Sequence, residues 1–290
     1  MKPAFLVIDI GSNSVRRMLG AWQNGRAVSL SKTLRTTRLA AGLDASRILR
    51  EERMTDTVNA IRAYAEEAET LGIGALAYAT SAVRDAANKA DFLERVKAAA
   101  GIDVLVLSGK EEGAYAYEAA TGGTGTVFDI GGGSFQIVTD KRALSVPCGC
   151  VRAKDRCDAQ DVQTLERELF AWIDASATLP KRVPGPVYGV GGTITSIGAL
   201  LAGQTVYDGN SLSAITPDRL DRMLGSLCTQ SERERTRHPL LRERGEVILQ
   251  GATILRCMML RTHTDCVVPT DRDGMEGIAE ARLRPPAPLN

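Results

Sequence analysis

Short apolar runs and longer segments of helical spacing alternate along the first part of the chain. The Asn24-Gly25 pair between two of the apolar runs is a strong signal for a hairpin turn. Over residues 51–71, apolar side chains recur at three- and four-residue steps, which predicts a helix that ends at Gly72. The pattern predicts strands over residues 5–9, 15–22, 26–34, 73–79 and 103–107, and helices over residues 51–71, 91–100 and from 108 onward.

The pattern begins again after the Gly- and Thr-rich segment 121–125. Val127 to Ser134 and Val7 to Ser14 both read V-hydrophobic-D-I-G-x-x-S, and a strand is expected after each copy. The aspartates of the two copies lie 120 positions apart (129 minus 9), which indicates two similar domains rather than a short repeat. The division is expected at residue 122, which gives an N-terminal domain over 1–122 and a C-terminal domain with extra helices over 123–290.

The second unit continues the alternation of strands and helices. Its pattern predicts a strand over residues 187–190 and helices over residues 161–175, 193–201, 218–228 and 245–262. Because strands alternate with helices, we expect an α/β fold in which helices cover the faces of a sheet. A length of 290 residues, 44% of them hydrophobic, suits two domains of moderate size.

The overall charge is close to neutral, with 36 basic and 35 acidic residues and a net charge of +1. No field of the whole molecule would draw the protein onto duplex nucleic acid or an anionic membrane, so an anionic ligand must be captured by local geometry. The N-terminus carries no signal-peptide pattern, and no apolar segment reaches the roughly 18 residues that cross a bilayer. We therefore expect a cytoplasmic protein without membrane contacts.

Cysteine and histidine spacing argues against a zinc site. The six cysteines form no paired C-x-x-C motif, and the two histidines, His238 and His263, stand far apart in the sequence. In a chain of this length we also expect no disulfide framework, and we interpret the thiols as reduced and mostly buried.

The first candidate ligand-binding motif is the turn Gly11-Ser12-Asn13-Ser14 after the strand-ending Asp9. Successive backbone N–H groups in such a turn form a concavity that binds phosphate, and the hydroxyl and amide groups add donors. Asp9 would repel a bare phosphate, so we expect it to hold Mg²⁺ or the water shell of Mg²⁺. On its own this copy is equally explained as a hairpin turn capped by polar side chains.

The second copy of the motif favours phosphate binding over a plain hairpin turn. Gly131, Gly132 and Gly133 follow the strand-ending Asp129 and precede Ser134, and consecutive glycines are unfavourable for stability. Two such turns, one in each domain, would face each other across a cleft and bind a phosphate chain from both sides. We assign Asp129, like Asp9, to Mg²⁺.

Two further segments add weaker candidates. Gly191-Gly192-Thr193 leads from a strand into a helix, and helix N-termini attract phosphate, although glycines before a helix also serve simple packing. Arg16 and Arg84 each follow a strand end and could clamp a phosphate with a planar guanidinium, although most arginines are surface residues. The basic cluster 233–244 could track a long polyanion or form a solvated helix surface.

The segment Ser108 to Glu112 supplies a candidate general base. Ser108 and Glu111 fit a helix capping box, so Glu111 already has a structural role. Glu112 is then left in the first helical turn beside the expected cleft. The helix dipole slightly favours its charged form there, which is the form that a general base requires. Without the other motifs, Glu112 would be interpreted as a solvated carboxylate.

Together these motifs resemble the exopolyphosphatase / guanosine pentaphosphate phosphohydrolase (Ppx/GppA) family. The matching stretches are Asp9 to Arg16, Ala79 to Arg84, Ser108-Gly109 with Glu111-Glu112, Asp129 to Ser134, and Val190 to Thr193. The resemblance implies two similar actin-like (ribonuclease H-like) ATPase domains with a cleft between them. It also implies Mg²⁺-dependent release of the terminal phosphate from polyphosphate or guanosine pentaphosphate. In the family pattern, Glu112 is the catalytic glutamate and Arg84 contacts phosphate.

Three positions depart from the family pattern. Gln136 stands where the family usually has glutamate, and glutamine can orient a water molecule but accepts a proton very poorly. Asp273-Gly274-Met275 replaces the usual Gly-Leu-Arg, and Ala114 stands where arginine is frequent. The chain therefore resembles a divergent short member of the family.

The leading hypothesis is hydrolysis at the end of a phosphate chain, with Glu112 activating water and Arg84 and Gln136 assisting. A second hypothesis is a sensor that binds guanosine tetra- or pentaphosphate, with Gln136 marking lost catalysis. A third is an ATP-dependent small-molecule kinase, for which the sequence offers no acceptor-binding residues. The sequence leaves open which phosphate substrate is preferred, and the resemblance is compatible with a homodimer.

Overall fold

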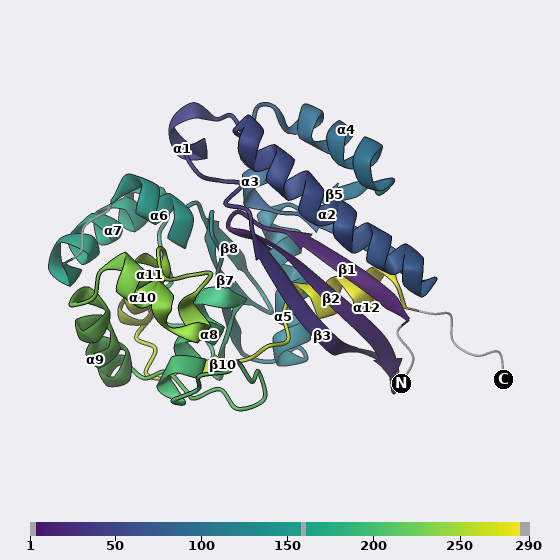
Figure 1. The fold of residues 1–290 in the computed structure, drawn as a ribbon. Helices are drawn as coiled ribbons and strands as arrows, with labels where there is room; N and C mark the ends of the chain where they lie inside the picture. The colour runs from purple at the N-terminus through teal and green to yellow at the C-terminus, as the bar shows by residue number, and fades with distance from the viewer. Residues whose placement is uncertain (1–3, 158–160, 285–290) are drawn as a thin grey trace.

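Two five-stranded sheets form the framework of the protein. The computed structural model describes residues 4–157 and 161–284. The first sheet has the strand order β3-β2-β1-β4-β5 and the second has the order β10-β9-β6-β7-β8 (Figure 1). The first sheet contains β1 (Phe5–Ile10), β2 (Ser14–Gln23), β3 (Arg26–Thr36), β4 (Gly74–Ala79) and β5 (Val104–Val106). The second contains β6 (Thr126–Ile130), β7 (Phe135–Thr139), β8 (Ala143–Val146), β9 (Val187–Val190) and β10 (Val268–Pro269).

The two sheets share one topology. In each, the central strand, β1 or β6, pairs antiparallel with the strand that follows it in sequence and parallel with a strand on its other side. The hairpin between β2 and β3 turns at Asn24 and Gly25, whose φ angles are 51° and 75°, as the sequence pattern predicts. The sequence echo between residues 7–14 and 127–134 thus corresponds to equivalent strand-and-turn units in the two sheets.

Helices cover the first sheet on both faces. On one face, α2 (Glu51–Leu71) packs against α4 (Lys89–Ala100), and α2 also contacts β1, β2 and β4. The helix predicted over residues 51–71 is confirmed, and it ends at Gly72, whose φ is 65°. Two short helices, α1 (Leu43–Ser46) and α3 (Ser81–Asp85), complete this side.

The second lobe is built around a long buried helix, α11 (Ile248–Thr262), against which the other helices of this lobe gather. Its apolar residues, such as Ile254 and Leu255, are fully buried among side chains from the second sheet. The surrounding helices are α6 (Cys150–Arg156), α7 (Val162–Ser176), α8 (Gly191–Leu201), α9 (Pro217–Cys228), α10 (Glu232–Arg237) and the 3₁₀ helix η1 (Pro239–Leu241).

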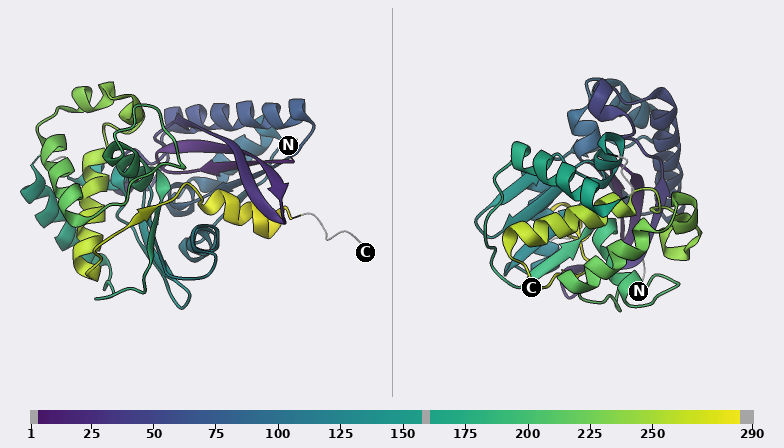
Figure 2. Two further views of the ribbon diagram at one scale, coloured as in Figure 1. Left: turned by 90° about the horizontal axis from the view of Figure 1, so that it is seen from below. Right: turned by 90° about the vertical axis from the view of Figure 1, so that its left-hand side faces the viewer.

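Two helices cross between the lobes. The helix α5 (Gly109–Thr121) follows β5 of the first sheet but packs on β6, β7 and β8 of the second sheet. Conversely, α12 (Gly274–Arg282) follows β10 of the second sheet but packs on β1 and β3 of the first, and it lies against α5 (Figure 2). The division of the chain at residue 122 stays a prediction. The helix α5, which precedes residue 122, packs on the second sheet, and α12, which follows it, packs on the first.

Among residues 4–157 and 161–284, no helix is both long enough and apolar enough to cross a membrane.

Candidate active site

The turns after β1 and β6 meet at the boundary of the two lobes. A Cβ atom at Gly132 would lie 2.8 Å from the Cβ of Ser12 and 3.0 Å from the backbone nitrogen of Asn13. At Gly133, a Cβ would lie 2.3 Å from the Oγ of Ser81, which itself hydrogen-bonds the Oγ of Ser12 at 3.0 Å. Glycine is therefore required where the second turn approaches the first so closely.

The two turns have the same internal hydrogen bond. Gly11 N–H donates to the carbonyl of Ser14 at 3.1 Å, and Gly131 N–H donates to the carbonyl of Ser134 at 2.9 Å. In the part of the chain that the structure describes, the N–H groups of residues 12, 13, 132 and 133 have no protein acceptor. These four donors, two from each lobe, are available to a phosphate group.

A pocket lies between the turns and takes its walls from both lobes. Most of the residues singled out in the sequence line it: Asp9, Gly11, Ser12, Asn13, Ser14, Arg16, Glu112, Asp129, Gly131, Gly132, Ser134, Gly191 and Gly192. Four do not line it: Arg84, Gln136, Gly133 and Thr193. The lining also includes residues that sequence reasoning did not assign to the site: Tyr78, Thr80, Ser81, Arg244 and Asp273.

Glu112 lies in the first turn of α5 and contributes its carboxylate to the pocket wall. The capping box predicted for Ser108 and Glu111 is confirmed, with Glu111 N–H donating to Ser108 Oγ at 3.2 Å and Ser108 N–H donating to Glu111 Oε2 at 2.9 Å. Glu112 Oε2 is buried and has no hydrogen-bond partner among the described residues, although it forms an ion pair with Arg84 Nη1 at 3.5 Å. Because Glu112 lines the pocket, its carboxylate can accept a hydrogen bond from a water molecule there.

The electrostatic environment of Glu112 differs from the sequence-based expectation. Burial, followed by the charge of Asp129, raises the pKa of Glu112 to about 8, and the charge of Arg84 opposes this shift. Burial therefore outweighs the slight preference for the charged form that the helix dipole is expected to give.

Asp9 and Asp129 form the acidic part of the pocket. Asp9 Oδ2 accepts hydrogen bonds from Arg16 Nε at 2.9 Å and Nη2 at 2.5 Å, whereas its buried Oδ1 has no hydrogen-bond partner among the residues that the structure describes. Burial raises the pKa of Asp9, and Arg16 opposes the shift. Burial also raises the pKa of Asp129 to about 7, with Arg16 opposing and the charges of Asp273 and Asp9 reinforcing the shift.

This acidic arrangement fits a Mg²⁺ ion that is shared with a phosphate ligand. No group of three or more His, Cys, Asp or Glu side chains forms a metal-binding cluster among the described residues. Mg²⁺, however, is commonly held by one or two carboxylates, with substrate phosphates and water completing the octahedron. Two features fit this kind of Mg²⁺ site. Asp9 Oδ1 has no hydrogen-bond partner among the described residues, and burial disfavours the ionised form of Asp129, which a bound cation would favour.

Arg84 and Gln136 lie behind Glu112 rather than in the pocket wall. Arg84 Nη1 donates to the carbonyl of Leu107 at 3.0 Å and lies 3.5 Å from Glu112 Oε2. Gln136 is 2% exposed and pairs with Asp129 in the register of β6 and β7. The catalytic roles predicted for these two residues stay predictions, and their positions suit orientation of Glu112 and Asp129.

The two glycines that begin α8 allow the side chains of Asp129 and Arg244 to approach the backbone. Gly191 has a φ of 83°, and a Cβ there would lie 2.6 Å from Asp129 Oδ1. A Cβ on Gly192 would lie 1.8 Å from Nη2 of Arg244, so the guanidinium of Arg244 covers this glycine and forms part of the pocket wall. Arg244 belongs to the basic cluster 233–244, but its sequence position gives no local signal that it reaches the start of α8.

Comparison with known proteins gives one consistent family. The model of the Ppx/GppA phosphatase family matches residues 21–280. Exopolyphosphatase 2 of Mycobacterium tuberculosis is 28% identical, over 94% of this chain and 96% of its own length. Exopolyphosphatase 1 of Mycobacterium bovis is 32% identical, over 60% of this chain and 55% of its own length.

Solved structures agree with the architecture. A Ppx/GppA family member from Aquifex aeolicus has a TM-score of 0.77 and 27% identity, covering 96% of this chain and 97% of that chain. An exopolyphosphatase from Cytophaga hutchinsonii has a TM-score of 0.83 at 20% identity, covering 96% of this chain and 97% of that chain, which supports the fold alone. The predicted α/β fold with two actin-like domains is confirmed.

Proposed function

The chain belongs to the Ppx/GppA phosphatase family, and from this premise we propose that it hydrolyses the terminal phosphoanhydride bond of inorganic polyphosphate or guanosine pentaphosphate. The observation that carries the proposal is the position of Glu112. Glu112 lines a pocket whose walls also carry two turns that offer free N–H groups to a phosphate. Phosphoryl transfer requires mainly positioning and electrostatic stabilisation, and these groups supply both.

The terminal phosphate is held between the two lobes. The free N–H groups of residues 12, 13, 132 and 133 donate to its oxygens, and the hydroxyls of Ser12 and Ser134 add donors. Because the donors come from both lobes, the phosphate is fixed in orientation as well as in place. This fixed orientation lets a water molecule approach the phosphorus in line with the leaving oxygen.

Glu112 orients and deprotonates the attacking water. The water oxygen forms a bond to the terminal phosphorus, the bond from that phosphorus to the bridging oxygen breaks, and the water proton passes to Glu112. A base works best when its pKa lies near the operating pH, and burial raises the pKa of Glu112 to about 8, which is in that range. A base in this position contributes roughly 10²–10⁴-fold to the rate.

Asp9 and Asp129 would hold Mg²⁺ against the phosphate chain. When bound, the ion neutralises charge that develops on the phosphate oxygens. The two carboxylates also set a condition on binding, because they repel an anionic chain that carries no cation. Arg244, held over Gly192, adds positive charge to the pocket wall.

Phosphate release from purified protein tests the proposal. Long polyphosphate, guanosine pentaphosphate and ATP are offered in parallel, with Mg²⁺ and with chelator. We expect Mg²⁺-dependent release from at least one of the first two, and little from ATP. Tight binding of guanosine pentaphosphate by calorimetry without release would favour the sensor hypothesis, to which Gln136 points. ATP consumption that depends on an added acceptor would instead indicate a kinase.

A further inference from the structure

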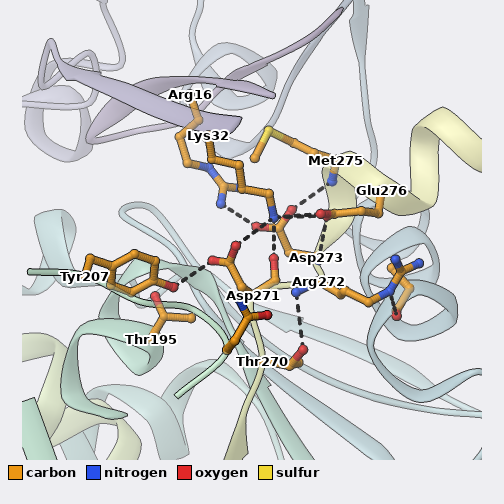
Figure 3. Close-up of polar contacts among 12 residues, drawn as sticks. Arg16, Lys32, Thr195, Tyr207, Thr270, Asp271, Arg272, Asp273, Met275 and Glu276 are labelled. Carbon is orange, nitrogen blue, oxygen red and sulfur yellow. Dashed lines mark hydrogen bonds and ion pairs between the residues drawn. The ribbon is translucent and has the colours of Figure 1, made fainter. Parts of the chain in front are cut away.

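A buried network of charges joins β2 and β3 to the segment that leads from β10 into α12 (Figure 3). Arg16 Nη1 donates to Asp273 Oδ2 at 2.5 Å. Lys32 donates to the carbonyl of Asp271 and lies 2.8 Å from Glu276 Oε1. The network therefore places an acidic residue of the crossover segment, Asp273, directly beside an arginine of the pocket wall.

Asp273 divides its two oxygens between two tasks. Its Oδ1 accepts from Met275 N–H at 2.9 Å and caps α12, and Glu276 completes the capping box by accepting from Asp273 N–H at 3.0 Å. Its Oδ2 faces Arg16. Helix capping uses only the first oxygen, so the charge that Asp273 adds to the pocket is not needed for the cap.

Arg16 is left with little net attraction for a phosphate. Its Nε and Nη2 donate to Asp9 and its Nη1 donates to Asp273, so that two carboxylates surround one guanidinium. Burial alone would raise the pKa of Asp273, but Arg16, Lys32 and the Met275 N–H lower it to about 2. Asp273 is therefore ionised, and its carboxylate, together with that of Asp9, offsets the charge of Arg16.

Four carboxyl groups line the pocket, on Asp9, Glu112, Asp129 and Asp273, and two guanidinium groups do, on Arg16 and Arg244. Burial favours the protonated forms of Glu112 and Asp129, so the charge beside Arg16 comes from Asp9 and Asp273. A bare phosphate chain would place further negative charge beside these two carboxylates. A chain complexed with a divalent cation would not.

Building on the proposed function, we propose that Asp273 is a specificity-determining residue, which cancels the charge of Arg16 so that the pocket selects phosphate chains complexed with a divalent cation over bare chains. In this arrangement Arg16 serves to position Asp9, and its charge becomes available to the phosphate only when Asp273 is neutral. The pocket discriminates by charge balance and not by the shape of the phosphate, which is the same in both forms.

The test is the affinity for tripolyphosphate, measured by calorimetry with Mg²⁺ and with chelator. Both proteins carry Glu112→Gln to slow hydrolysis, and one also carries Asp273→Asn, which keeps an oxygen to cap α12 but removes the charge. We expect Asp273→Asn to tighten binding of the bare chain roughly tenfold, the size expected from removing one nearby charge at intermediate dielectric. Binding of the Mg²⁺ complex should change much less, so the preference for the complex falls.

Two controls separate this effect from a structural one. Asp161→Asn changes another capping aspartate, at the start of α7, which accepts from Thr164 N–H and is exposed away from the pocket. It should leave both affinities unchanged. If thermal melting shows that the Asp273→Asn protein is poorly folded, Asp273→Ser replaces it in the test, because serine also offers a capping oxygen. We expect Asp273→Ser to tighten binding of bare tripolyphosphate in the same way.

The outcomes distinguish this inference from the proposed function. An unchanged or weaker affinity for bare tripolyphosphate in both Asp273 variants would show that Asp273 only anchors α12, and would overturn the inference. If the Glu112→Gln protein bound no tripolyphosphate even with Mg²⁺, the proposed function itself would be contradicted.

Discussion

At the scale of single residues, the pocket contains ionisable groups whose pKa values are shifted by burial. The pKa of Glu112 rises from an ordinary 4.5 to about 8, and that of Asp129 rises from 3.8 to about 7, in both cases with burial as the largest cause. Such shifts mean that the folded protein binds protons that the unfolded chain has already released. A nearby positive charge would favour the ionised forms of these two carboxyl groups.

This property predicts how stability depends on pH. Between pH 5 and 8 the folded state holds more protons than the unfolded state, so the free energy of unfolding falls as pH rises through this window. In chelator, we expect urea unfolding to show a loss on the order of a few kcal/mol between pH 5 and pH 9. Glu112→Gln should show a clearly smaller loss, since its side chain does not titrate.

Equal pH dependence in the wild type and in Glu112→Gln would mean that Glu112 titrates normally. Adding Mg²⁺ at pH 9 gives a further check on the same electrostatics. We expect it to raise the free energy of unfolding of the wild type, because a bound cation compensates the carboxylates that have lost their protons.

Sequence reasoning found some site residues and missed others for a physical reason. Glu112 could be singled out because the capping box accounted for Glu111, and both turns could be recognised from local glycine and serine spacing. Arg244 and Asp273 act through contacts with Gly192 and Arg16, which lie far from them in the chain. The Asp273-to-Glu276 capping pattern was a local signal for a helix start, but it carried no information about the pocket.

At the scale of elements, the start of α8, directly after β9, determines where the guanidinium of Arg244 lies in the pocket wall. The guanidinium of Arg244 occupies the space that a side chain on Gly192 would need. The helix start and the arginine therefore act as one unit, although they come from different segments of the second lobe.

Replacing Gly192 with alanine should displace Arg244 from the pocket. The added Cβ would overlap the end of a flexible side chain, so the guanidinium can swing away without unfolding the protein. We expect the KM for polyphosphate to rise by about tenfold, in line with the loss of one charge-assisted hydrogen bond, with a small change in melting temperature. Steady-state phosphate release measures this.

Gly225→Ala provides the matched control for that experiment. Gly225 lies exposed in α9, and a Cβ there would meet no atom within 4 Å. It should leave KM unchanged and slightly raise stability, because alanine favours a helix over glycine. A Gly192→Ala protein with the same KM as the Gly225→Ala protein would contradict a role for Arg244 in binding.

Strong periodicity made most elements predictable. The helix over 51–71 and the strand over 187–190 match the structure residue for residue. The elements β8, α6 and β10 were not predicted, since each is short and is formed by contacts with distant segments rather than by its own sequence pattern. The helix expected from residue 245 begins at Ile248.

At the scale of the whole molecule, the internal repeat predicts two lobes but not the way in which they are tied together. The helices α5 and α12 each follow a strand of one sheet and pack on the other sheet, and they contact one another. Ion pairs such as Arg38 with Glu246 at 2.6 Å and Arg152 with Asp85 at 2.5 Å also join the lobes. These long-range contacts leave no trace in local spacing.

The crossing of α5 has a direct consequence for catalysis. Because α5 starts at the first sheet and packs on the second, its first turn lies at the lobe boundary, and Glu112 lines the same pocket as the turns after β1 and β6. The central claim is that this carboxylate activates water for attack on a phosphate held by both lobes.

The most direct test compares phosphate release from Glu112→Gln and Glu111→Gln at saturating polyphosphate with Mg²⁺. Glu111 is the matched control, because glutamine at that position still completes the capping box. The account predicts that Glu112→Gln lowers the turnover rate roughly 10²–10⁴-fold while polyphosphate still binds, and that Glu111→Gln stays near the wild-type rate. Wild-type turnover in Glu112→Gln, or an equal loss in both variants, would contradict it.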